Sequence, residues 1–194
     1  MRDPGSVHRR SIRLKGYDYA QPGAYFVTIY TQNRLCLVGD VREGKMHLNA
    51  AGSMVARWWA ELASKFPMAR PDDCVVMPNH FHGIVIIVGA DLGVCPNLGV
   101  CPNPVCPAGV QGAHVGAPLP EIIQWFKTMT TNEYIRGVKE FGWPRFPNRL
   151  WQHNYYEHII RNEGELSRIR RYIAENPLKW ALDRENPACR GKGL

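Results

Sequence analysis

The sequence lacks any apolar run of membrane-spanning length, and residues 1–15 are basic without the apolar segment of a secretory signal. We therefore expect a cytoplasmic protein with no membrane partner. The six cysteines contain no CxxC spacing, and three lie in one degenerate stretch, so we expect reduced thiols. A chain of 194 residues with no visible boundary is long enough for one sizeable core and short for two, which predicts a single domain over residues 1–194.

Acidic residues are also in the minority. The chain has 24 Lys and Arg against 17 Asp and Glu, which gives a formal charge of +7 and a pI near 9.2. This excess of positive charge suits a polyanionic partner, of which nucleic acid is the first candidate. The alternative is ordinary solvated surface charge. Residues 1–16 form a basic arm with Arg9, Arg10, Arg13 and Lys15, which we expect to lie along a phosphate backbone or to be disordered.

The hydrophobic pattern predicts an α+β fold. Runs of β-branched and aromatic residues predict strands over residues 24–31, 35–38, 73–77 and 82–88, with a short strand within 155–160. Apolar residues at helical spacing predict helices over residues 49–65, 119–137 and 163–175. The last is capped by Asn162, and Asn176-Pro177 either breaks or restarts it. A polar hairpin is expected at 41–48. Strand, helix, two strands and then helices is the order of a ferredoxin-like antiparallel sheet with helices packed on it.

Residues 89–118 do not have the pattern of a packed core, because LGVCPN occurs twice in tandem and a Gly- and Ala-rich tract follows. A stretch of about thirty residues without an element of its own is typical of an insertion. We expect a mobile Gly/Pro/Cys-rich insertion within the single domain. The alternative is a metal-binding knuckle, although its spacing fits no common zinc pattern; its members would be Cys95, Cys101, Cys106 and His114.

His80 and His82 stand two positions apart where a predicted strand begins. Alternate residues of an extended chain face the same way, so both imidazoles should lie on one face and Phe81 should be buried on the other. Two imidazoles on one face can share a divalent metal. The alternative from spacing alone is a pair of strand histidines without a metal.

The last predicted helix carries groups for phosphodiester chemistry. Tyr172 and Asn176 are four residues apart and share one flank with Arg168, four residues before the tyrosine. A phenol that attacks a phosphodiester needs a fixed position, a Lewis acid and nearby positive charge. Tyr172 is therefore the candidate nucleophile. A half-buried helix tyrosine without a catalytic role is the alternative, and Tyr155 and Tyr156 are the other candidate nucleophiles.

The two histidines and Asn176 together predict a metal site. Two imidazoles and an amide oxygen can hold one divalent ion and leave positions open for phosphate and water. Mg²⁺ prefers oxygen ligands and a two-imidazole site also suits Mn²⁺, so we expect one of these two ions as the cofactor.

Two segments carry a family resemblance, MPNHFHGIVII at 77–87 and WQHNYYEHIIRNEGELSRIRRYIAENPLKW at 151–180. With SIRLKGYDYAQPGAYFVTIYTQNR at 11–34, they resemble single-strand DNA transposases of the HUH endonuclease type, which have a His-hydrophobe-His motif and one catalytic tyrosine. The branch that the chain resembles most is that of the REP-associated tyrosine transposases. The resemblance covers most of residues 9–185 outside the insertion.

The resemblance implies an enzyme whose histidine pair and helix amide, here His80, His82 and Asn176, bind one divalent metal. It implies that the helix tyrosine, here Tyr172, attacks single-stranded DNA, forms a 5′-phosphotyrosine link and frees a 3′-hydroxyl. The substrate would be a DNA hairpin, often a repeated extragenic palindrome. The chain departs from the pattern in the insertion at 89–118, which would reduce activity if it folds across the groove.

Contacts to DNA phosphates are expected from cationic side chains, with solvated charge as the alternative. Besides the basic arm, the candidates are Lys127, Arg161, Arg168 and Arg171. Trp151, Tyr155 and Tyr156 either stack on unpaired bases or belong to the core. His158 either orients the site or caps a strand.

Three functions fit these residues. The first is metal-dependent nicking and strand transfer of single-stranded DNA, and the second is a catalytically silent nucleic-acid-binding protein on the same fold. The third is a nickase of the replication initiator or relaxase kind, which usually has a longer chain. The complete set of His80, His82, Tyr172 and Asn176 favours the first. A homodimer, with the tyrosine acting in its own subunit or in the partner's, is left open.

Overall fold

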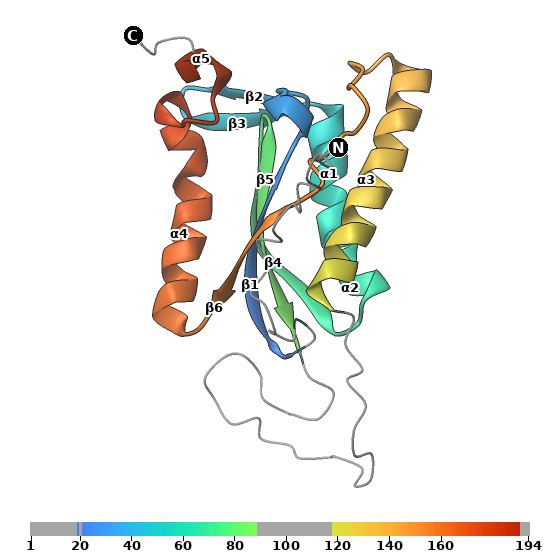
Figure 1. Ribbon diagram of the computed structural model, residues 1–194. Coiled ribbons are helices and arrows are strands. Elements are labelled where there is room, and N and C mark those ends of the chain that lie inside the picture. Colours follow the sequence, from blue (N-terminus) through green and yellow to red (C-terminus); the bar gives the residue numbers. More distant parts are fainter. Residues whose placement is uncertain (1–18, 20, 89–117, 191–194) are drawn as a thin grey trace, which may run out of the picture.

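The computed structural model describes residues 19, 21–88 and 118–190 (Figure 1). The predictions for the basic arm (Arg9, Arg10, Arg13 and Lys15) and for the tandem LGVCPN repeat concern residues outside these ranges. The same holds for the alternative metal-binding knuckle at Cys95, Cys101, Cys106 and His114.

One antiparallel sheet of four strands forms the centre of the described structure, in the order β4-β5-β1-β6. The strands are β1 Gly23–Tyr30, β4 Ala69–Met77, β5 His80–Ile87 and β6 Tyr156–Ile160. Helices connect β1 to β4 and β5 to β6, which gives the ferredoxin-like arrangement of two split β-α-β units. The predicted fold class is therefore confirmed.

Helices cover both faces of this sheet (Figure 1). One face carries α1 Ala50–Ala60, α2 Leu62–Lys65 and α3 Leu119–Phe141, and the other carries α4 Glu163–Lys179. Short elements complete the described chain, namely η1 Gln32–Arg34, the hairpin of β2 Gly39–Arg42 and β3 Lys45–Leu48, η2 Trp180–Leu182 and α5 Pro187–Arg190. None of the described helices combines the length and apolar composition needed to cross a bilayer.

Several predicted boundaries differ from the structure. The strand predicted at 35–38 does not form, because the amides of Leu37 and Val38 both donate to the carbonyl of Pro78 in the β4–β5 turn. The helix predicted to end before Asn176-Pro177 continues to Lys179, since a proline in the last turn removes only one intrahelical hydrogen bond. The predicted hairpin at 41–48 is confirmed by β2 and β3.

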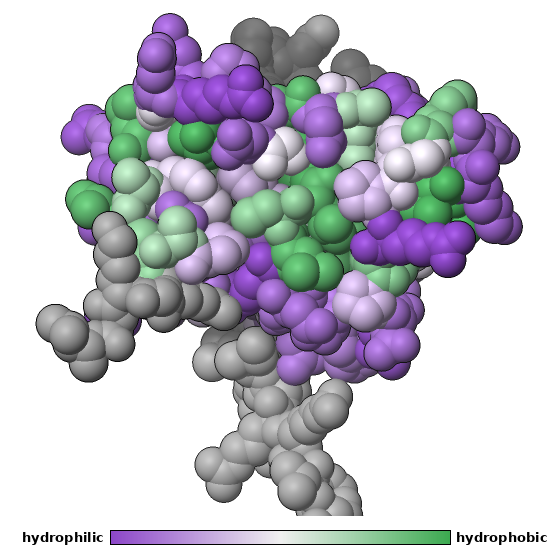
Figure 2. Space-filling view, turned by 90° about the horizontal axis from the view of Figure 1, so that it is seen from above, coloured by the Kyte–Doolittle hydropathy of each residue, from purple (hydrophilic) through white to green (hydrophobic). Residues whose placement is uncertain are grey.

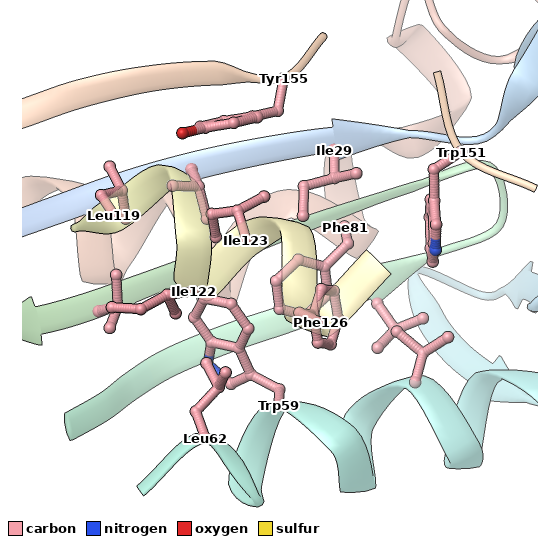
Figure 3. Packing of buried hydrophobic residues seen from close by; sticks show 14 of the residues in the cluster. Ile29, Trp59, Leu62, Phe81, Leu119, Ile122, Ile123, Phe126, Trp151 and Tyr155 are labelled. Atoms are coloured by element: carbon pink, nitrogen blue, oxygen red, sulfur yellow. The ribbon is translucent and has the colours of Figure 1, made fainter. Parts of the chain in front are cut away.

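Two hydrophobic clusters hold the layers together. The larger lies between the sheet and α1–α3, where the Phe81 ring packs on Trp59 and Phe126 with centroid distances of 4.7 and 5.2 Å (Figure 3). The smaller lies under α4 and includes Phe26 and Ile173. Phe81 is fully buried in the first cluster while its neighbours in sequence face the second layer, so the predicted alternation is confirmed.

The three cysteines in the described part of the chain, Cys36, Cys74 and Cys189, are free thiols, in line with the expectation from spacing.

Packing around Phe81 should dominate the stability of β5. Phe81→Ala removes a fully buried ring between two helices, so we expect the free energy of unfolding to fall by about 3–5 kcal/mol in urea denaturation. Phe81→Leu keeps part of the buried volume and should cost less. A loss below about 1 kcal/mol for Phe81→Ala would show that the cluster collapses onto the gap.

Candidate active site

The structure brings the four residues predicted for the site into one place. His80 and His82 come from β5, and Tyr172 and Asn176 come from α4. The two imidazole rings are 4.6 Å apart between centroids, and the Tyr172 hydroxyl lies 3.4 Å from His82 Nε2. The histidines and Asn176 are buried, whereas Tyr172 is 42% exposed. A phenol that is open to solvent therefore lies beside a buried group of nitrogen and oxygen atoms.

Contacts at several points fix α4 over this face of the sheet. Ile173, one residue after the tyrosine, is buried in the smaller cluster. Arg170 Nη2 donates to Asp72 Oδ2 of β4 at 2.5 Å, and this hydrogen bond raises the pKa of Arg170. The predicted cap is confirmed, because the Asn162 side chain accepts from the amide of Glu165 at 2.9 Å. The helix is thus anchored to the sheet by Arg170 and Ile173, on either side of Tyr172 in sequence.

Aromatic contacts set the position of the Tyr172 ring. The ring lies edge-on to Phe26, with centroids 6.0 Å apart, and 5.3 Å from the His82 ring. Phe26 in turn stacks on His82 at 5.3 Å. Tyr172 therefore packs against two rings of the sheet and is still partly open to solvent.

Asn79 determines which nitrogen of His80 carries the proton. Its Nδ2 donates to the carbonyls of Arg34 at 3.1 Å and Glu185 at 2.7 Å, which identifies the nitrogen side of the amide. Its Oδ1 then faces His80 Nδ1 at 2.9 Å and accepts a hydrogen bond from it. His80 is consequently the Nδ1–H tautomer, and the lone pair is on Nε2.

Thr28 contacts His82 in the corresponding way. Its hydroxyl oxygen lies 2.8 Å from His82 Nδ1, a distance set by the direct pairing of these residues between β1 and β5. A metal on Nε2 requires Nδ1–H to donate to Thr28. Each imidazole thus has one nitrogen engaged by a neighbour and turns the other toward α4.

Burial keeps both imidazoles neutral. It lowers the pKa of His80 to about 4, and the guanidinium of Arg34 adds to this effect while the carboxylate of Asp183 opposes it. Burial and the neighbouring His80 lower the pKa of His82 well below its ordinary value. Near pH 7 the two rings therefore present lone pairs, which metal binding needs.

The Asn176 amide completes a set of acceptors. It lies beside His80 and raises the pKa of that ring, yet its buried Oδ1 accepts no hydrogen bond of ordinary geometry from the described residues. A buried amide oxygen that accepts no hydrogen bond from the described residues suits a cation. No cluster of three or more His, Cys, Asp and Glu occurs in the described part of the chain. The candidate metal ligands are therefore the two imidazoles and the Asn176 amide. That donor set offers two nitrogen ligands and one oxygen ligand to a single divalent ion.

The candidate phosphate-binding residues lie on both layers. Arg161, Arg168 and Arg171 are exposed at or beside α4. Lys127 lies on α3, and its ammonium group donates to the backbone carbonyls of Gln152 at 2.6 Å and His153 at 2.9 Å. The cations near α4 are therefore on the layer of Tyr172, and Lys127 is on the other.

The aromatic residues before β6 separate into two groups. Trp151 and Tyr155 are buried in the larger cluster, so they belong to the core (Figure 3). Tyr156 pairs with Thr28, which places it on the face of the two imidazoles, and it is 51% exposed. His158 Nε2 lies 2.8 Å from Glu165 Oε1, which ties β6 to α4.

Sequence reasoning missed Asn79 and Thr28. Both had a signal: Asn79 directly precedes the histidine pair, and Thr28 is a lone hydroxyl within the apolar run AYFVTIYT. A small polar residue at a buried strand position needs a partner, which here is His82.

The chain has a relative in sequence and a neighbour in structure among known proteins. No protein-family model matches it. An uncharacterised protein of Haemophilus influenzae is 37% identical over 179 residues, which cover 92% of this chain and 93% of that protein. The solved structure of a REP-associated tyrosine transposase bound to a REP hairpin matches with a TM-score of 0.51 at 18% identity, over 86% of this chain and 73% of that one. This second similarity shows the shared fold.

A further solved structure, from Deinococcus radiodurans R1, has a TM-score of 0.44 at 15% identity, over 84% of this chain and 95% of that one.

The contact between Thr28 and His82 should contribute to stability as well as to orientation. Thr28→Val keeps the side-chain shape but leaves the buried His82 Nδ1 without a partner, so we expect the free energy of unfolding to fall by about 1–3 kcal/mol. Thr28→Ser retains the hydroxyl and should lose less. Urea denaturation measures both, and equal losses for the two variants would contradict the proposed hydrogen bond.

Proposed function

This chain belongs to the same family as the uncharacterised Haemophilus influenzae protein and has the fold of the REP-associated tyrosine transposase, and we propose that it cleaves and rejoins single-stranded DNA through Tyr172. The observation that carries the proposal is the placement of the Tyr172 hydroxyl 3.4 Å from His82 Nε2, one helical turn before the unpaired Asn176 oxygen. A nucleophile and a cation site on the same helix flank are what phosphodiester cleavage by a phenol requires.

In the proposed reaction the Tyr172 oxygen forms a bond to phosphorus while the bond from phosphorus to the 3′-oxygen breaks. The phenol loses its proton to solvent, to which its exposure gives access, and the leaving 3′-oxygen takes up a proton. The product is a 5′-phosphotyrosine link and a free 3′-hydroxyl. In the reverse step a 3′-hydroxyl attacks the same phosphorus and displaces Tyr172, which rejoins the strand.

His80, His82 and Asn176 would hold the Mg²⁺ or Mn²⁺ cofactor. A divalent ion at this place supplies a Lewis acid that draws charge from the phosphate oxygens. Asn79 and Thr28 keep the two rings in the orientation that binding needs.

The surroundings of the site suit a single strand. Arg168 lies one turn before Tyr172 on the same flank, where its charge can offset that of the phosphate. Seen from the end at which β1 ends and β5 begins, hydrophobic residues lie in the middle and toward both sides, interspersed with hydrophilic residues (Figure 2). Apolar surface suits unpaired bases and charged groups suit phosphates.

The substrate we propose is a single-stranded DNA hairpin, and the neighbour with the same fold was solved bound to a REP hairpin. Arg161, Arg168 and Arg171 would contact its phosphates. Tyr172 and His82 meet within one chain, so a homodimer is not needed to assemble the site.

Covalent capture of DNA tests the proposed function. With a single-stranded hairpin oligonucleotide pool and Mn²⁺, the protein should form an adduct that survives a denaturing gel, and Tyr172→Phe should abolish it. Tyr156→Phe is the matched control, because Tyr156 is exposed on the same face and should not form the link.

Retarded DNA in a native gel with no adduct under either metal would instead identify a catalytically silent DNA-binding protein. An adduct that persists in Tyr172→Phe would assign the nucleophile elsewhere.

Metal binding should be visible without DNA. At about a hundredfold excess over Kd, a bound ion stabilises the fold by about 2.7 kcal/mol, so Mn²⁺ should raise Tm by several degrees relative to EDTA. His80→Ala and Asn176→Ala should each remove most of this rise in thermal denaturation. His158→Ala, which changes a histidine outside the set, should keep it; an equal rise in all variants would contradict the assignment.

A further inference from the structure

A hollow opens beside α3, away from the candidate active site. Residues 148–153 form one wall, and a polar stripe of α3 that includes Lys127, Thr131 and Asn132 forms the other. Its volume of about 420 Å³ lies within the range of about 300–1,000 Å³ that is typical of small-molecule sites. We call it the lateral hollow.

The lateral hollow is positively charged. Lys127, Arg149 and His153 line it, and its lining residues include no Asp or Glu. The Lys127 ammonium holds the opposite wall through the carbonyls of Gln152 and His153, which fixes its charge between the two walls. An anionic ligand would therefore meet cations that are already positioned, without a carboxylate that repels it.

Arg149 is the cation best suited to a ligand. Its side chain is exposed, and its guanidinium lies 3.5 Å from the His153 ring. Among the described residues it takes part in no ion pair. A guanidinium of this kind can bind a phosphate with two parallel hydrogen bonds.

The hollow and the candidate active site share one end of the sheet. The amide of Gln152 donates to the carbonyl of Tyr30 at 2.8 Å, and the Tyr30 ring lies 5.4 Å from the His80 ring. The same segment continues into β6, the edge strand, where half-exposed Tyr156 lies on the face of Tyr172. The segment that lines the hollow and the edge strand that carries Tyr156 are therefore consecutive in the chain.

We propose that the lateral hollow binds one unpaired nucleotide of the DNA strand that is processed at Tyr172, an inference that rests on the proposed function. Arg149 and His153 bind the phosphate, and the Asn132 amide hydrogen-bonds to the edge of the base. Phosphate contacts position a strand and contacts to base edges select its sequence. The hollow is thus a specificity site, separate from the residues that cleave.

Two probes and matched variants test this. The probes are a fluorescein-labelled DNA hairpin with a randomised single-stranded extension of about six nucleotides, and the same hairpin without the extension. Arg149→Gln is compared with Arg145→Gln, which removes the same charge from an exposed residue of the same loop outside the hollow. Fluorescence anisotropy over a salt series gives Kd and its salt dependence.

Arg149→Gln should weaken binding of the extended hairpin about tenfold and reduce the salt slope by about one, with little change for the hairpin alone. Arg145→Gln should stay within about twofold of the parent protein. Asn132→Ala should weaken binding of the extended hairpin without a change in salt slope, because it removes no charge.

Equal effects of Arg149→Gln and Arg145→Gln, equal losses for both probes, or no binding of the extended hairpin by the parent protein would each overturn the inference. The adduct assay separates this result from the proposed function. An adduct with no special effect of Arg149 leaves cleavage standing and removes only the nucleotide site. Arg149-dependent binding without any adduct leaves the nucleotide site and removes cleavage.

Discussion

The site depends on β5 being different on its two faces. Phe81 packs between Trp59 and Phe126 in the larger cluster. Because side chains alternate along a strand, His80 and His82 then face α4. A shift of one residue in the pairing of β5 would turn both histidines toward that cluster and the phenyl ring toward α4. The same hydrophobic contacts that stabilise the sheet therefore set the direction of the two rings.

The partner of these rings comes from a helix 90 residues later in the chain. Contacts other than those to the imidazoles hold this helix: its Ile173 side chain is buried in the smaller cluster, and its Arg170 donates a hydrogen bond to Asp72. Tyr172 can consequently stay exposed and retain a defined position. A rigid support and an accessible hydroxyl are both needed by a group that must meet a large substrate.

Periodicity predicted much of this arrangement. The two-residue period placed the histidines on one face, and the four-residue spacing placed Tyr172 and Asn176 on one flank of a helix. The partners of the histidines were not predictable in this way, because Thr28 reaches His82 only through the pairing of β1 with β5, which no local pattern specifies. The strand predicted at 35–38 was wrong for the same reason, because the amides of Leu37 and Val38 donate to the distant carbonyl of Pro78. The lateral hollow was not predictable either, because its two walls are separate in sequence.

Asn79 also joins the His80 ring to the end of the described chain, since its amide donates to the carbonyl of Glu185, and Glu185 itself forms an ion pair with Arg34. Glu185 thus supplies one of the two carbonyls that orient the Asn79 amide toward the ring. If binding at His80 and docking of residues 183–186 are coupled, each raises the equilibrium constant of the other by the same factor. A partner that displaces residues 183–186 would therefore weaken ligand binding at the imidazoles from a distance.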